Sequence, residues 1–169
     1  MQPIVISVLG KDKPGIVDAL AKRIYQHGGN WQGSSFAHMA GMFTGFVEVH
    51  LPVNEHEKLV KALDDLPDLN VRSVSVADTS ASYSDKRVIE VMGHDKTGIV
   101  QELTNALNEF NLNILSFDSS CQSAPNWGSL MFKARVVIAV PETFEDTSLT
   151  EALENLSNDL VVDIGSLTE

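Results

Sequence analysis

Apolar and polar positions change their period several times in the first half of the chain, and each change predicts a new element. The β-branched run Ile4–Leu9 predicts an interior strand. A turn at Gly10 follows, and Pro14 is predicted to be the first residue of a helix because proline is favoured there. Gly28 is predicted to close that helix in the left-handed conformation. The residues predicted to form the buried stripe of the helix are Ile16, Val17, Leu20, Ala21, Ile24 and Tyr25.

A hairpin, a second helix and a closing strand are predicted to follow. The hairpin strands are expected at about Asn30–Met39 and Met42–Leu51. Asn54 and Glu57 have the spacing of a capping box, which predicts the start of the second helix. A short strand over Leu69–Val76 is expected to end this half of the chain. The leucines predicted to bury one face of the second helix are Leu59, Leu63 and Leu66.

The same pattern occurs a second time, with Gly93 standing 83 residues after Gly10. Ile4–Val17 aligns with Arg87–Val100 without a gap, and Asn111 takes the place of Gly28. Asparagine is the other residue that readily adopts the left-handed conformation, so the helix end is predicted to be the same. The strands predicted for this copy are Val88–Met92, the hairpin strands Asn113–Cys121 and Ser129–Val140, and Leu160–Ile164. Its first helix is predicted to be buried by Ile99, Val100, Leu103 and Leu107. Its second helix is predicted from a capping box at Ser148 and Glu151 and from a buried stripe of Leu149, Leu153 and Leu156.

The order of these elements predicts the fold class. Each copy follows the order βαββαβ, which is an α+β, ferredoxin-like arrangement of a four-stranded antiparallel sheet with two helices on one face. We expect two such domains in tandem, at residues 1–78 and 87–169, joined by a small and polar linker at 79–86. Because open sheet edges need covering, packing of one copy on the other or a homodimer is also expected.

The charge of the chain restricts its partners. The net charge is −11, and it is uneven: residues 1–83 hold seven basic and nine acidic side chains, whereas residues 84–169 hold five and fourteen. Direct binding to nucleic acid is not expected, because such binding depends on lysine and arginine displacing counterions. The chain has a single cysteine, no long apolar run and no secretory signal at its start, so we expect a cytoplasmic protein that binds no membrane.

The sequence contains no motif that predicts catalysis or metal binding. Its five histidines lack the HExxH spacing and form no cluster with cysteine, so no metal site is expected. There is no GxSxG segment and no phosphate-binding P-loop. We therefore expect a protein that is not an enzyme and that needs no cofactor.

The turn between the first strand and the first helix of each copy resembles the ACT domain family. The resemblance rests on Gly10, Asp12, Pro14 and Gly15 with the apolar pair that follows, on their copy from Gly93 to Val100, and on an asparagine after each first helix. Thr97 departs from this pattern, because it replaces the proline. The resemblance covers almost the whole chain and implies two small ferredoxin-like modules that bind amino acids and regulate enzymes or transcription.

A chain built of two ACT domains is similar to the glycine cleavage system transcriptional repressors. That resemblance implies a protein that responds to glycine and contacts a DNA-bound activator of the LysR type without reading DNA itself. A regulatory subunit of an amino-acid metabolic enzyme is the alternative.

A site for a free amino acid needs donors for its carboxylate and acceptors for its ammonium group. The backbone amides at residues 15–17 and 98–100 are the expected donors, because the first amides of a helix have no partner within it. Side-chain oxygens in or beside the second strand of each copy are the expected acceptors. The predicted ligand-binding residues are Gly10, Asp12, Gly15, Ile16, Val17, Asn30, Ser34, Gly93, Asp95, Gly98, Ile99, Val100, Asn113 and Asp118. A purely structural role for the glycines, Asp12 and Asn30 is the alternative.

Overall fold

The computed structural model describes residues 1–76, 85–123 and 128–167. The chain forms two compact units, Met1–Ser80 and Ala81–Glu169, which we call the first and the second module. Most of the expected linker, residues 79–84, lies outside the described residues. Its last two residues, Asp85 and Lys86, already belong to the first strand of the second module.

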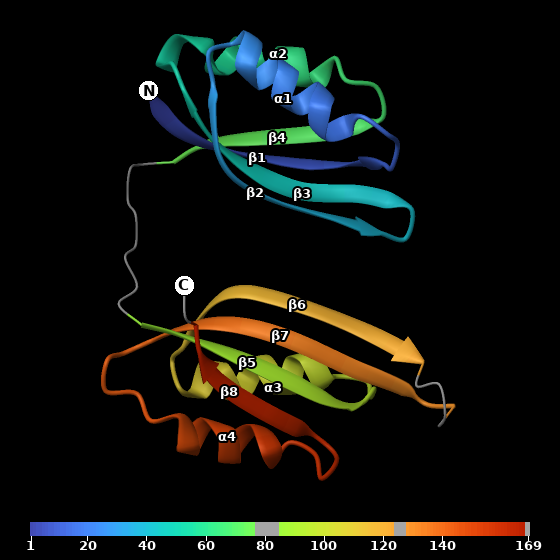
Figure 1. Ribbon diagram of the computed structural model, residues 1–169, viewed down its shortest axis with the longest axis vertical. Helices are drawn as coiled ribbons and strands as arrows, with labels where there is room; N and C mark the ends of the chain where they lie inside the picture. Colours follow the sequence, from blue (N-terminus) through green and yellow to red (C-terminus); the bar gives the residue numbers. More distant parts are fainter. Residues whose placement is uncertain (77–84, 124–127, 168–169) are drawn as a thin grey trace. The chain divides into compact units, whose positions relative to one another are not determined.

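Both modules have the predicted βαββαβ order, and both helices of each module lie on one face of its sheet (Figure 1). The strands are hydrogen-bonded in the order β2-β3-β1-β4 and β6-β7-β5-β8, with every pair antiparallel. The elements of the first module are β1 (Gln2–Lys11), α1 (Ile16–Gln26), β2 (Asn30–Met39), β3 (Met42–Leu51), a 3-10 turn (Val53–Glu55), α2 (His56–Asp64) and β4 (Leu69–Ser75). Those of the second are β5 (Asp85–His94), α3 (Ile99–Glu109), β6 (Asn113–Ser123), β7 (Leu130–Val140), α4 (Asp146–Glu154) and β8 (Val161–Ser166).

Alternation along the central strands separates a buried face from an open face in each sheet. In β1, Ile4, Ile6 and Val8 are at most 2% exposed beneath the helices, whereas Ser7 and Leu9 point to the side that carries no helix. Each module has its own core of aliphatic side chains drawn from its own sheet and helices. The predicted leucine stripes of the second helices are buried, except that Leu156 is only partly so.

The first helix of each module starts later than predicted. Gly15 precedes α1 with φ 87°, and Gly98 precedes α3 with φ 88°, so each adopts the left-handed conformation. A residue in that conformation cannot belong to a right-handed helix, so Pro14 lies outside α1 and the prediction that it begins the helix is wrong. Thr97 therefore replaces proline at a position where no helix has begun.

The helix ends match the prediction, but the capping boxes do not. Gly28 has φ 70° and Asn111 has φ 55°, which confirms the left-handed closure at both positions. Asn54 lies in the 3-10 turn before α2, and Ser148 lies inside α4. Neither helix is capped by a side-chain hydrogen bond, so both predicted capping boxes are wrong.

Candidate functional site

The turn between β1 and α1 is held at two points by the rest of the first module. The backbone N–H of Asp12 donates to the carbonyl oxygen of Gly41 in the hairpin turn, over 3.1 Å. The ammonium group of Lys13 donates to the carbonyl oxygen of Pro67, beyond the end of α2, over 3.2 Å. The turn is thus fixed between the hairpin and the segment that leads into β4.

The second module repeats both contacts. Asp95 N–H donates to the carbonyl oxygen of Leu130 over 2.9 Å, and Lys96 Nζ donates to that of Leu156 over 3.2 Å. Lys96 also forms an ion pair of 2.6 Å with Glu102. Sequence reasoning missed both lysines, although their recurrence in the two copies was a signal. These repeated contacts support a structural role for the turn.

Gly10 and Gly93 make room for the chain itself. A Cβ atom on Gly10 would overlap the carbonyl oxygen of Asp68 and would lie 2.5 Å from Cδ2 of Leu69. A Cβ atom on Gly93 would lie 2.9 Å from Cδ1 of Leu160. The absence of side chains at these two positions lets the segment before the last strand of each module pass close by.

The start of the first helix offers fewer ligand contacts than expected. The amide of Ile99 already donates to the carbonyl oxygen of Lys96, over 3.2 Å. The side chains of Ile16 and Ile99 are 3% and 6% exposed and belong to the cores. Val17 and Val100 are more than 40% exposed, and Gly15 and Gly98 are exposed as well. A ligand could therefore approach each helix start only from the side of its exposed glycine and valine.

The asparagine after each first helix lies far from the turn that precedes the helix. Asn30 pairs with His50, which pairs with Pro3, whereas Gly10 pairs with Phe43 at the other end of the sheet. Pro3 and Gly10 are seven residues apart, which is roughly 23 Å at about 3.3 Å per residue. Within one module, Asn30 and the turn therefore do not line one cleft.

The second module has the same separation. Asn113 pairs with Ala139, which pairs with Lys86, seven residues before Gly93. Ser34 and Asp118 lie within their strands, away from both ends. The ligand-binding role of the predicted residues stays a prediction.

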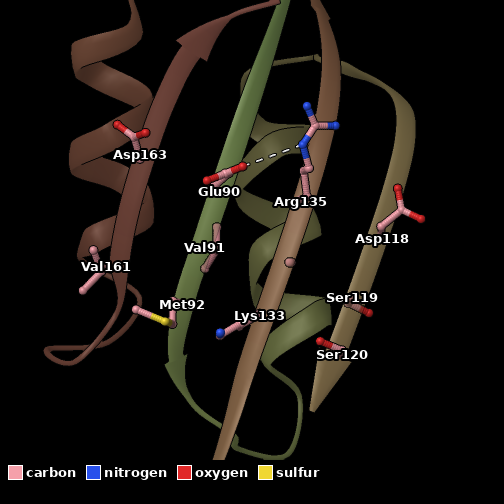
Figure 2. A pocket seen from close by; sticks show the side chains of 11 residues that line it. Glu90, Val91, Met92, Asp118, Ser119, Ser120, Lys133, Arg135, Val161 and Asp163 are labelled. Atoms are coloured by element: carbon pink, nitrogen blue, oxygen red, sulfur yellow. Dashed lines mark ion pairs between the residues drawn. The ribbon is translucent and has the colours of Figure 1, made fainter. Parts of the chain in front are cut away.

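A hollow of about 590 Å³ lies on the open face of the second sheet, and a row of four charged side chains, one from each strand, crosses it (Figure 2). Arg135 of β7 pairs with Asp118 of β6 on one side and with Glu90 of β5 on the other, and Glu90 pairs with Asp163 of β8. We call these four residues the charge row. Asp118 is its only member among the predicted site residues.

The charges of this row are poorly paired within the module. Nε of Arg135 lies 3.7 Å from Oε1 of Glu90, which is longer than a hydrogen bond, and both side chains are more than half exposed. Among the described residues, Asp118, Asp163 and the neighbouring Lys133 have no ion pair within 4.0 Å. Two cations and three carboxylates therefore line one open hollow and remain available to a ligand.

The first module differs at each of these positions. Its open face has a hollow of about 950 Å³, and the row that corresponds to the charge row consists of Ser35, Phe46, Ser7 and Arg72. Phe46 is 55% exposed, and Leu9 beside it is 47% exposed. The two modules share a fold, but their open faces differ in chemistry.

An acidic group joins β5 to the segment before β8 in the second module. Asp159 accepts hydrogen bonds from the hydroxyl of Ser157, from Nδ1 of His94 over 2.6 Å and from the His94 amide over 3.1 Å. These bonds, that of Ser157 first, hold the pKa of Asp159 well below its ordinary value of 3.8.

The lowered pKa of Asp159 predicts a loss of stability in acid. A carboxyl group whose pKa is lower in the folded state stabilises the fold above its unfolded pKa, and this stabilisation is lost as the pH falls below about 4. The stability of the second module is therefore expected to decline below this pH, and to decline less in the variant Asp159→Asn. Urea unfolding between pH 7 and pH 3 measures the difference, and equal slopes for both proteins would contradict the prediction.

Within the described ranges, no three or more histidine, cysteine, aspartate or glutamate residues are placed to hold a metal ion. Among the helices of the same residues, none has the length and hydrophobicity that a membrane span needs.

Comparison with known proteins places both modules in one family. The sequence model of the ACT domain matches residues 2–71 and again residues 87–165. A search of curated protein sequences finds no match.

Two solved structures share the tandem arrangement. A protein of unknown function from Galdieria sulphuraria is 24% identical, with 99% of each chain covered and a TM-score of 0.85. A protein provisionally named as a glycine cleavage system transcriptional repressor is 20% identical, with 99% of this chain and 98% of that chain covered and a TM-score of 0.70. At these identities the likeness shows the fold alone. The two family matches together cover most of the sequence, and the chain belongs to the ACT domain family.

Proposed function

We propose that this chain is a cytoplasmic, amino-acid-responsive regulator that controls transcription of a glycine cleavage system by binding a DNA-bound activator protein. The observation that carries the proposal is that both modules match the ACT domain, and the two matches together leave little of the chain unassigned. The fold shared over nearly the full length with a provisionally named glycine cleavage repressor supports it. The chain acts as an adaptor and not as an enzyme.

The charge of the chain supports a protein partner in place of DNA. With a net charge of −11, the chain would be repelled by phosphates, and the second module carries most of the excess. A complementary partner surface is basic. We propose an activator of the LysR type as this partner and glycine as the signal.

A gel-shift experiment with a LysR-type activator on its DNA tests this function. The expected result is that the chain retards the activator–DNA complex further, that glycine changes the concentration needed, and that the chain leaves bare DNA unshifted. Retardation of bare DNA, or no effect on the complex with or without glycine, would contradict the proposal. Copurification with a catalytic subunit would instead favour a regulatory subunit of an amino-acid metabolic enzyme.

A further inference from the structure

The charge row combines both signs of charge at the spacing of neighbouring strands. Asp118, Arg135 and Glu90 stand on three adjacent strands, and strands in a sheet are about 4.8 Å apart. A cation thus lies between two carboxylates, and Lys133 lies two residues before Arg135 on the same face of β7. A ligand with one charge would meet repulsion from part of this surface, whereas a compact zwitterion would find a partner for each of its groups.

We propose that the open face of the second sheet binds the zwitterion of a free α-amino acid at Arg135. This inference rests on the proposed function and assigns its sensing site. The guanidinium group of Arg135 holds the ligand carboxylate, aided by Lys133, because a planar guanidinium can donate two parallel hydrogen bonds to a carboxylate. Asp118, on the β6 side of Arg135, accepts from the ligand ammonium group.

The surroundings of the charge row set the orientation of the ligand. Met92 and Val161 form the apolar border of the hollow on the β5–β8 side and are 42% and 62% exposed (Figure 2). An aliphatic ligand side chain directed toward them would cover apolar surface, so the site is expected to accept leucine as well as glycine. The zwitterion is the shared requirement, and the side chain adjusts the affinity.

The first module does not offer the same site. Phe46 stands where the second module has Arg135, and Ser35 and Ser7 stand where it has Asp118 and Glu90. The row in the first module therefore lacks the cation between two carboxylates, although Arg72 occupies its β4 end. Among the residues that the structure describes, the proposed site therefore occurs once, in contrast to the turn before the first helix, which occurs in both modules.

Calorimetric titration of the full chain with glycine, L-leucine and their one-charge analogues tests the ligand chemistry. Glycinamide and methylamine lack the carboxylate, and N-acetylglycine and acetate lack the ammonium group. Binding of glycine and leucine with none of the four analogues is the expected result. Equal binding of any analogue, or no heat with either amino acid at up to about 10 mM, overturns the proposal.

Variants borrowed from the first module test the position of the site. Arg135→Phe and Asp118→Ser introduce the residues that the first module has at the equivalent positions. Both side chains are exposed, so the fold is expected to persist. Each is expected to weaken leucine binding by at least about tenfold. Arg72→Ala in the first module is the matched control and is expected to leave the affinity unchanged.

The ligand site and the proposed function can be contradicted by different results. Unchanged affinity in Arg135→Phe, with circular dichroism confirming the fold, places the ligand elsewhere and overturns the site but not the proposed function. In the gel shift, Arg135→Phe is expected to retain the activator contact and to lose the response to amino acid. Absence of any activator contact in the unaltered chain contradicts the proposed function, whatever the titration shows.

Discussion

Replacement of Gly10 by alanine is expected to destabilise the first module by about 3 kcal/mol, at the upper end of what overpacking usually costs. The added methyl group would overlap the carbonyl oxygen of Asp68 and crowd the side chain of Leu69. Leu69 can rotate, but the carbonyl belongs to the backbone that leads into β4. Relief therefore requires that the strand itself moves away from β1.

Urea unfolding of the Gly10→Ala variant, followed by circular dichroism, measures this loss. Gly33→Ala is the matched control in the same module, because a Cβ atom there meets nothing within 4 Å, and a change within about 0.5 kcal/mol is expected. Gly93→Ala should fall between the two, since its nearest neighbour is a movable leucine methyl at 2.9 Å. Equal stability of Gly10→Ala and Gly33→Ala would show that the β4 backbone does not approach Gly10 closely.

Truncation of Leu107 to alanine is expected to cost the second module about 3 kcal/mol and to leave the first module unchanged. Leu107 is 0% exposed within a core to which only the second module contributes. The loss combines the removed apolar contact with the cavity that remains, and such changes usually cost about 2–5 kcal/mol.

Hydrogen exchange distinguishes the two modules in the Leu107→Ala variant. Amides of β5 and β7 should lose protection, whereas those of β1 and β3 should exchange as in the unaltered protein. Leu20→Ala, at 0% exposure in the first core, is the reciprocal variant and should reverse the pattern. Loss of protection in both modules from either variant would mean that the two cores unfold as one.

The repeat made most of the fold predictable from the sequence. Strand alternation, helical stripes and the equivalent positions Gly28 and Asn111 each recur in both copies, so a pattern read in one could be checked in the other. The late start of α1 was not predictable from Pro14, because its location depends on the left-handed conformation of Gly15. The capping boxes failed because spacing alone did not show where the turn before each second helix ends.

The candidate site was only partly predictable. Asp118 was singled out as an acceptor, but Arg135, Glu90 and Asp163 were not, because their proximity depends on the register of four strands. One signal was present in the sequence. Glu90 interrupts the apolar run Val88–Met92 at the position equivalent to Ser7, and a charged residue there indicates the open face.

The number of amino acid molecules bound per chain tests the central claim most directly. Equilibrium dialysis of the purified chain against labelled leucine and glycine gives this number without assuming a site. We predict one molecule per chain, because within the described residues only the second module has a cation between two carboxylates on its open face. Two molecules per chain would instead favour the duplicated turns, and none at saturating concentrations would contradict the sensing of free amino acids by this protein.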